Sequence, residues 1–361
     1  MRKFILFLMS VFAIGCIAGD FYTTWDWDKP YKGGKFEQKD TTWQPDILEG
    51  YECRFVNQGE AFDGPCRSTI IRKRCNLKSH RGFLYVHGFN DYFFQSEMGD
   101  RFVDSGYHFY AVDLRRYGRS RLPWQYPFNV RNQNEYFADI DSALAQMKRD
   151  GIEDITLGGH STGGLTVTLY AAEKGSEIGV DRVVTDSPFL AWNFSPFMRK
   201  VAIPTVSFFG GLFKNSKIKQ SKCDGYAYSL LKEYDGYWTY NTNWKMIDSP
   251  PVTMSWIRAI TKAQKRIKKR RENICVPLLV MHSSRKIDGC NFTPDFMTGD
   301  AVLDPFAIQQ IGVTLGRDKD RTVVCAIDSG LHDLILSRPR PREAAYDTIF
   351  KFIRTFTPDP D

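Results

Sequence analysis

The chain has 361 residues, of which 42% are hydrophobic and 25% are charged, and its formal net charge is +7. This length suits one large catalytic domain with an insertion or two ordinary domains, and the composition is that of a globular protein with a sizeable core. Much of the positive excess lies in one run, residues 262–271, and no recognised nucleic-acid-binding motif accompanies it. We therefore predict no nucleic-acid partner.

The N-terminus has the pattern of a secretory signal. Arg2 and Lys3 precede an apolar run over residues 4–14, and small residues follow that run. The run is too short for a comfortable membrane span. We therefore predict a signal peptide over residues 1–18, followed by an N-terminal linker over residues 19–49.

A second reading of the same segment is a lipoprotein signal. Residues 12–16 resemble a bacterial lipobox, in which the cysteine, here Cys16, is lipidated and becomes the first residue. Ordinary cleavage after Ala18 competes with this reading. In either case we predict a secreted protein or one held at the cell envelope.

Several cysteines remain in the rest of the chain. Cys53, Cys66 and Cys75 lie in one predicted hairpin region, so we expect a disulfide to come first from among them, although the sequence gives no pairing. Cys325 lies within an apolar strand, where we expect a buried free thiol.

Short apolar runs alternate with helical patterns along the chain. The predicted strands are residues 51–57, 68–74, 82–87, 108–113, 154–158, 182–186, 276–281 and 322–327. The predicted helices are residues 132–149, 165–174 and 342–356. Continuous Val, Ile and Leu runs are typical of strands buried on both faces, and strands that alternate with helices indicate parallel crossovers. We predict an α/β fold with a mostly parallel, eight-stranded sheet flanked by helices.

One segment interrupts this alternation. About eighty residues, 191–271, separate the sixth and seventh predicted strands, far more than a crossover of about a dozen residues needs. The segment is rich in aromatic residues, and we interpret it as an inserted cap over a core formed by residues 50–190 and 272–361. Its basic run, residues 262–271, is a candidate contact for a membrane surface, although such runs are more often solvated helix faces.

The strongest chemical signal is Gly159-His160-Ser161-Thr162-Gly163, which follows the fifth strand and precedes a helix. A Gly-x-Ser-x-Gly motif in that setting is a nucleophile elbow of an α/β hydrolase, in which Ser161 occupies a strained turn. The glycines Gly159 and Gly163 leave room for the backbones that cross there. We predict that Ser161 is a nucleophile.

A second signal is His87-Gly88-Phe89-Asn90, directly after the third strand. Hydrolases of this fold often place an oxyanion-hole donor in the loop that follows this strand. The predicted donors are the backbone N–H groups of Phe89 and Thr162.

Chain order identifies the base. In this fold the acid and then the histidine follow the serine, and only His282 and His332 lie after Ser161. His282 ends the seventh strand and leaves no room for an acid before it, so we predict that His332 is the general base. The candidate acids after that strand are Asp288, Asp295, Asp300 and Asp304, and spacing alone does not choose between Asp300 and Asp288.

These motifs together resemble the monoacylglycerol-lipase and lysophospholipase-like α/β hydrolases, which are grouped with the serine aminopeptidase family. The resemblance rests on Gly-His-Ser-x-Gly-Gly (residues 159–164), the His-Gly loop, Asp113 to Ser120, and Gly-Asp-x-Val-x-Asp-Pro (residues 299–305). It covers roughly residues 50–190 and 272–356. The family pattern implies that Asp300 is the acid, with Asp288 as the alternative, and that no metal or cofactor is used.

The expected activity is therefore hydrolysis of carboxylic esters through an acyl-enzyme, with a small apolar acyl ester such as a monoacylglycerol or lysophospholipid as substrate. A serine aminopeptidase is one alternative. Capture of a substrate amine would require acidic residues in the segment 191–271, but that segment is basic and aromatic. A non-catalytic binding protein on the same fold is another alternative. The sequence does not indicate an oligomeric state.

Overall fold

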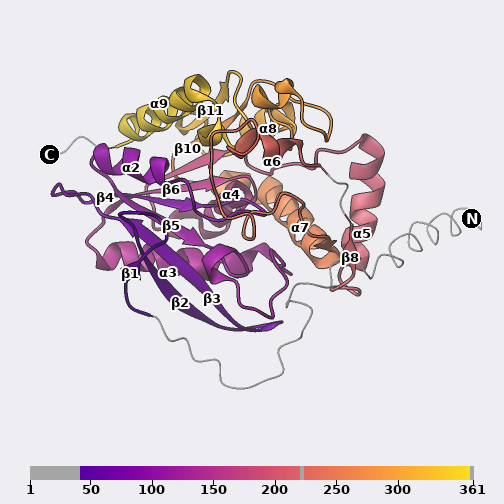
Figure 1. Ribbon diagram of the computed structural model, residues 1–361, viewed down its shortest axis with the longest axis horizontal. Helices are drawn as coiled ribbons and strands as arrows, with labels where there is room; N and C mark the ends of the chain where they lie inside the picture. Colours follow the sequence, from indigo (N-terminus) through magenta and orange to yellow (C-terminus); the bar gives the residue numbers. More distant parts are fainter. Residues whose placement is uncertain (1–40, 220–222, 358–361) are drawn as a thin grey trace, which may run out of the picture.

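The computed structural model describes residues 41–219 and 223–357 of the chain (Figure 1). The predicted signal peptide with Cys16, and the predicted linker up to residue 40, lie outside the described residues. Within the described ranges, no helix has both the length and the apolar character needed to cross a membrane.

A twisted, mostly parallel sheet of nine strands forms the centre of the molecule (Figure 1). Its strands run in the spatial order β1 (Gln44–Pro45), β2 (Glu52–Ala61), β3 (Gly64–Lys73), β5 (His108–Asp113), β4 (Arg81–Val86), β6 (Asp154–His160), β7 (Arg182–Asp186), β10 (Leu278–Ser283) and β11 (Thr322–Ile327). The strands from β5 to β11 pair in parallel, whereas β1, β2 and β3 pair in antiparallel fashion at one edge. All eight predicted strands are present, and β1 is an additional short edge strand. The α/β-hydrolase fold predicted from the sequence is confirmed.

Two hydrophobic cores lie on opposite faces of this sheet. Leu84 and Val86 of β4 point into one core, and Phe83 and Tyr85 of the same strand point into the other, because successive side chains of a strand alternate between faces. Helices therefore have to cover both faces, and residues 83–86 are apolar without interruption for that reason.

The helices divide between these two faces (Figure 1). The first core receives α3 (Phe137–Arg149), α4 (Thr162–Lys174), α7 (Met254–Arg270) and Ile308 of α8 (Pro305–Gly312). The second core receives α2 (Ser96–Asp104) and α9 (Pro339–Thr355). The three predicted helices correspond to α3, α4 and α9. Residues 133–136, the start of the first prediction, form a separate 3₁₀ turn that is capped by Asn132.

The segment 191–271 contributes both peripheral and core structure. It contains α5 (Ile203–Phe209), the short strands β8 (Lys217–Ile218) and β9 (Val252–Thr253), and α6 (Gly225–Leu230). Its last helix, α7, is capped by the Thr253 hydroxyl and packs against α4 with Ile260 and Ile267 buried. The division of the chain into core and cap at residues 190 and 272 stays a prediction.

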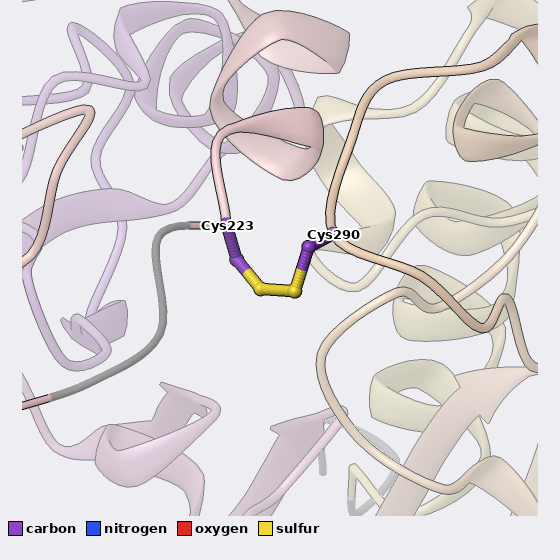
Figure 2. The surroundings of a disulfide bond; sticks show 2 residues. All are labelled: Cys223 and Cys290. Atoms are coloured by element: carbon purple, nitrogen blue, oxygen red, sulfur yellow. A yellow bond between two sulfur atoms is a disulfide. The ribbon is translucent and has the colours of Figure 1, made fainter.

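The disulfide prediction was wrong. Cys223 and Cys290 form a disulfide, whereas Cys53, Cys66 and Cys75 are free (Figure 2). The reason lies in the strand register, because Cys53 on β2 pairs with Ile71 on β3, which places Cys66 at the far end of the hairpin. Cys325 is free as expected, but it is partly exposed rather than buried.

The disulfide connects two segments that both reach the candidate site. Cys223 leads into α6, and Cys290 lies in the loop between β10 and Asp300, 67 residues further along the chain. The Gly225 N–H also donates to the Cys290 carbonyl at 2.9 Å. The bond therefore holds α6 against this loop.

Loss of the disulfide is expected to destabilise the fold. For a closed loop of this length, the chain-entropy model gives about 4 kcal/mol of stabilisation through the unfolded state. We expect Cys223→Ser to lower the free energy of unfolding by up to that amount in urea titrations, and a reductant to lower that of wild type similarly. Cys275→Ser, at a free and partly exposed thiol, is the control and should change little. Equal urea midpoints for Cys223→Ser and wild type would contradict the assignment.

Candidate active site

Ser161 occupies a sharp turn between β6 and α4. β6 ends at His160, α4 begins at Thr162, and Ser161 lies between them with φ 52° and ψ −115°. A positive φ is strained for any residue except glycine, by about 1–3 kcal/mol, and persists only where the surroundings enforce it. Here the Ser161 N–H donates to the Asp186 carbonyl at 2.9 Å, and the Ser161 carbonyl accepts from Leu165. This is the strand, turn and helix context that the sequence predicted for the elbow.

Glycines allow three backbones to meet at this turn. A Cβ atom on Gly163 would lie 2.3 Å from the carbonyl oxygens of both Val86 and His87. A Cβ on Gly159 would lie 2.7 Å from the Gly163 carbonyl oxygen, and one on Gly88 would lie 3.2 Å from the Ser161 Cβ. The end of β4, the end of β6 and the start of α4 can therefore converge only because these positions lack side chains.

The change Gly163→Ala is expected to destabilise the protein by about 3 kcal/mol. Overpacking usually costs about 1–3 kcal/mol, and here the atoms that must move are backbone carbonyls on both sides rather than flexible side chains. Gly211→Ala is a suitable control, since the nearest atom to its Cβ belongs to the end of the Arg258 side chain at 3.2 Å. Thermal unfolding of both variants checks this, and a Gly163→Ala melting temperature equal to that of wild type would contradict it.

His332 connects Ser161 to Asp300. Its Nε2 lies 2.9 Å from the Ser161 Oγ, and its Nδ1 lies 2.9 Å from Asp300 Oδ2. The other carboxylate oxygen, Oδ1, accepts from the backbone N–H groups of Val302 (2.7 Å) and Leu303 (2.8 Å). All three side chains are buried, and the Ser161 residue is 7% exposed. With both oxygens engaged, Asp300 is held in one orientation toward the imidazole.

The other candidate acids lie elsewhere. Asp288 is 84% exposed and pairs with Lys286, and Asp295 is 64% exposed and pairs with Arg285. Asp304 caps α8 by accepting from the N–H groups of Phe306 and Ala307. The structure therefore brings Asp300 to His332 and leaves Asp288 at the surface.

The remaining buried histidines near the sheet edge have structural partners. The Leu114 N–H donates to His87 Nε2 at 3.1 Å, and His87 Nδ1 lies 2.9 Å from the Gly88 carbonyl. Burial lowers the pKa of His87, and this bonding pattern fits a neutral ring with its proton on Nδ1. His282 Nδ1 lies 2.7 Å from the Ser283 carbonyl.

Of the predicted oxyanion donors, Thr162 follows Ser161 directly and Phe89 lies in the loop after β4. Thr162 is the first residue of α4, so its N–H has no partner within the helix, and Phe89 follows Gly88, which touches Ser161. The Phe89 ring packs on Phe128 and Trp256 at centroid distances of 5.2 and 4.8 Å.

Asn90 fixes the loop that carries Phe89, a role that the sequence analysis missed. Asn90 adopts φ 51°, and its side chain donates to the Met246 carbonyl (2.7 Å) and accepts from the Met246 N–H (2.8 Å). These two bonds join the loop to the segment 191–271. The position of Asn90 inside the His-Gly motif was the available signal.

A buried charge cluster adjoins the triad, and the sequence analysis missed it as well. Its members, which we call the charge cluster, are Asp91, His160, Asp186, Asp333 and Lys245, all 7% exposed or less. Lys245 Nζ lies 3.0 Å from Asp91 Oδ1, His160 Nε2 lies 3.8 Å from Asp333 Oδ2, and His160 Nδ1 lies 3.9 Å from Asp186 Oδ1. Asp91, His160 and Asp333 are chain neighbours of Asn90, Ser161 and His332. This proximity in sequence was the signal that could have pointed to them.

Protonation within the cluster follows from these contacts. Burial opposes charge on His160, but the carboxylates of Asp333, Asp186 and Asp91 outweigh it and raise the pKa of His160 to about 9. Burial raises the pKa of Asp333 to about 7, against the opposing effect of His160. Asp91, His160 and Asp333 each offer one donor atom, all within 4.8 Å of one another, and are the residues of this site that could hold a metal ion.

The site is closed in this conformation. Ser161 and His332 are 7% and 3% exposed, and a small apolar cavity of about 10 Å³ beside Phe89 has room for about one water molecule. Phe128, Val252 and Trp256 are among its walls. Access of a ligand to Ser161 therefore requires residues over the site to move.

Comparison with known proteins identifies the family. The family model described as Serine aminopeptidase, S33, matches residues 78–286, more than half of the chain. A search of curated proteins gave no match. The chain belongs to this serine aminopeptidase family of α/β hydrolases.

Solved structures agree with the fold. The monoacylglycerol lipase of Paleococcus ferrophilus is 17% identical with a TM-score of 0.56, and the alignment covers 84% of this chain and 99% of that one. A soluble variant of the Saccharomyces cerevisiae monoglyceride lipase, in complex with a substrate analog, is 15% identical with a TM-score of 0.59, and the coverage is 84% and 96%. At this identity the likeness establishes the fold.

Proposed function

We propose that this family member is a serine hydrolase that cleaves carboxylic esters, with Ser161 as nucleophile, His332 as general base and Asp300 as the acid that orients it. The observation that supports this most strongly is the continuous pair of 2.9 Å contacts from Asp300 through His332 to the Ser161 Oγ. Two such contacts on opposite nitrogens of one imidazole are what proton transfer from a serine hydroxyl requires.

In the proposed acylation step, His332 Nε2 takes the hydroxyl proton as the Ser161 Oγ attacks the ester carbonyl carbon. Asp300 accepts from Nδ1–H, and so keeps Nε2 free as the acceptor and stabilises the imidazolium that forms. The N–H groups of Phe89 and Thr162 hold the oxyanion, and each such donor typically contributes about 3 kcal/mol to transition-state stabilisation.

Collapse of the tetrahedral intermediate releases the alcohol, which takes its proton from His332. Water then enters, gives a proton to His332 and attacks the acyl-enzyme carbonyl by the same route. The second intermediate expels Ser161 Oγ, which regains its proton, and the carboxylic acid leaves. No step in this sequence needs a cofactor.

The proposed substrate is a small apolar acyl ester of the monoacylglycerol or lysophospholipid type. The Phe89 ring, in the loop after β4, packs on Phe128 and Trp256, and these apolar rings support an acyl chain rather than a charged group. The aminopeptidase alternative needs a carboxylate that a substrate amine at Ser161 can reach. Glu233 and Asp235 of the segment 191–271 lie at the surface, and the carboxylates of the charge cluster are buried beside Lys245 and His160. Esters are therefore favoured.

A lipid surface is the proposed place of encounter with such a substrate. Exposed apolar side chains gather before, along and after α5: Phe194, Phe197, Met198, Val201, Phe208, Leu212 and Phe213. The run 262–271 is less suited, since Arg266 and Arg270 pair with Glu173. Weaker sedimentation of Phe208→Ser with anionic phospholipid vesicles would support the α5 surface, and unchanged sedimentation would contradict it.

Export to the cell envelope or the medium also belongs to this proposal. The disulfide between Cys223 and Cys290 supports it, because disulfides persist mainly in oxidising compartments. Fractionation of the producing cells tests the location, and a chain found only in the cytosol would contradict it.

Covalent labelling tests the proposed function. A fluorophosphonate probe followed by peptide mass spectrometry should modify Ser161 of the folded protein, and p-nitrophenyl esters should turn over faster than aminoacyl anilides. Folded protein that neither labels at Ser161 nor hydrolyses esters would support a binding protein. Faster cleavage of the anilides would support the aminopeptidase.

A further inference from the structure

The charge cluster lies where four segments end near the triad. Asp91 lies in the loop after β4, His160 ends β6, Asp186 ends β7 and Asp333 follows His332 in the loop after β11. Lys245 comes from the segment 191–271. Buried charges are expensive, so a group of five such side chains needs a reason that packing alone does not supply.

The charges nearly cancel. The carboxylates of Asp91, Asp186 and Asp333 face Lys245 and His160, and they raise the pKa of His160. Other titratable side chains that act on these groups include Tyr85, Tyr92, Tyr226, Tyr240 and His87, and burial raises the pKa of these tyrosines and lowers that of His87.

The cluster is joined to the loop that carries His332. Asp186 Oδ2 accepts from the Leu334 N–H at 3.0 Å, and the Tyr226 hydroxyl accepts from the Asp333 N–H at 3.3 Å. The ring of His160 lies against the ring of His332, edge to face, with centroids 4.8 Å apart. The two residues after His332 are thus anchored, Asp333 by Tyr226 and Leu334 by Asp186. The His332 ring itself packs against the ring of His160.

We propose that Asp91, His160 and Lys245 are positioning residues, and that the charge cluster fixes the loop carrying His332 and so sets the alignment of its ring with Ser161. This inference rests on the proposed function. Lys245 gives it a further consequence, because the ion pair with Asp91 completes the cluster only when the segment 191–271 is seated. The triad is therefore aligned when that segment covers the site.

The charge cluster can position this loop because a buried ion pair is sensitive to the loss of one partner. Removal of Lys245 leaves Asp91 buried and uncompensated, which is strongly destabilising, whereas removal of both charges restores neutrality. Neither oxygen of Asp333 accepts a hydrogen bond from any residue described, so its position depends on the balance of charge around it. A single unpaired charge should therefore shift Asp333, and with it His332.

The test compares Lys245→Met, Asp91→Asn and the double variant. With a soluble short-chain p-nitrophenyl ester, we expect each single change to lower kcat about tenfold, with KM within twofold, and the double variant to recover most of kcat. Active-site titration with the fluorophosphonate corrects for misfolded protein.

Lys174→Met is the matched control, since it breaks the exposed pair with Asp141 (3.4 Å), and kcat should not change. A merely structural cluster would give lower melting temperatures but unchanged kcat per titrated site, and that result would overturn the proposal. Stoichiometric tightly bound divalent metal in the purified protein, lost in Asp333→Asn, would overturn it as well.

Histidine NMR separates this inference from the proposed function. If wild type neither labels nor turns over, the catalytic proposal fails, but the ring ¹⁵N shifts of His332 still report its position. They should change in Lys245→Met and return in the double variant. His332 shifts that are identical in all variants would overturn the inference, even in an active enzyme.

Discussion

Replacement of Ser161 by alanine is expected to lower kcat for ester hydrolysis by about six powers of ten, with the fold intact. Loss of the nucleophile of a serine triad costs about 10⁶ in kcat, because the base and the acid have no nucleophile to activate without it. What remains should be the smaller contribution of the oxyanion donors and of substrate binding.

The protein should remain folded in this variant. Alanine takes the same strained turn at φ 52°, and the only hydrogen bond of the Ser161 side chain with a described residue is the one with His332. Melting temperatures within a few degrees of wild type are therefore expected. Ser142→Ala, at a partly exposed position of α3, is the control and should retain full activity. Ser161→Ala with a tenth or more of wild-type kcat would remove Ser161 from the mechanism.

The sequence predicted Ser161 and His332 because both can be recognised from the order of elements along the chain. The elbow could be recognised because strand β6, the motif and α4 follow one another directly. His332 could be recognised because chain order left one suitable histidine. Both inferences need only the succession of elements along the chain and no knowledge of distances.

The choice between Asp300 and Asp288 needed more than spacing. After β10 the chain forms a loop that the Cys223–Cys290 disulfide holds in place. At the end of this loop, Asp300 forms a β-bridge with Lys286. The Asp300 N–H donates to the Arg285 carbonyl and its carbonyl accepts from the Ile287 N–H, both at 2.8 Å. Asp300 is thus near the strand end in space although it is remote in sequence, and only the family resemblance pointed to it.

The disulfide and the charge cluster escaped prediction for the same physical reason. Cys223 and Cys290 belong to segments whose approach depends on the tertiary fold, and the five charges come from five segments. Charged residues in a sequence are expected at the surface, so burial of Asp91, Asp186 and Asp333 cannot be read from pattern alone. Packing of several elements around one edge of the sheet decides it.

The change Asp300→Asn is expected to lower kcat about 10⁴-fold. The N–H groups of Val302 and Leu303 require an acceptor, so the carbonyl oxygen of asparagine should turn toward them and leave its NH₂ group facing His332 Nδ1. An N–H donor there stabilises the imidazole tautomer whose proton is on Nε2, and that nitrogen can no longer accept the Ser161 proton. In a known serine protease, the same type of change costs about 10⁴ in kcat with the geometry preserved.

Asp288→Asn is the matched comparison, since it makes the same chemical change at the rival position. Its side chain is 84% exposed and touches Lys286, so activity should stay within twofold of wild type. Steady-state kinetics of both variants, with melting curves to confirm folding, decide between the two acids. A large loss in Asp288→Asn and full activity in Asp300→Asn would mean that the loop between β10 and α8 rearranges when the site opens, because only such a movement could bring the exposed carboxylate to His332.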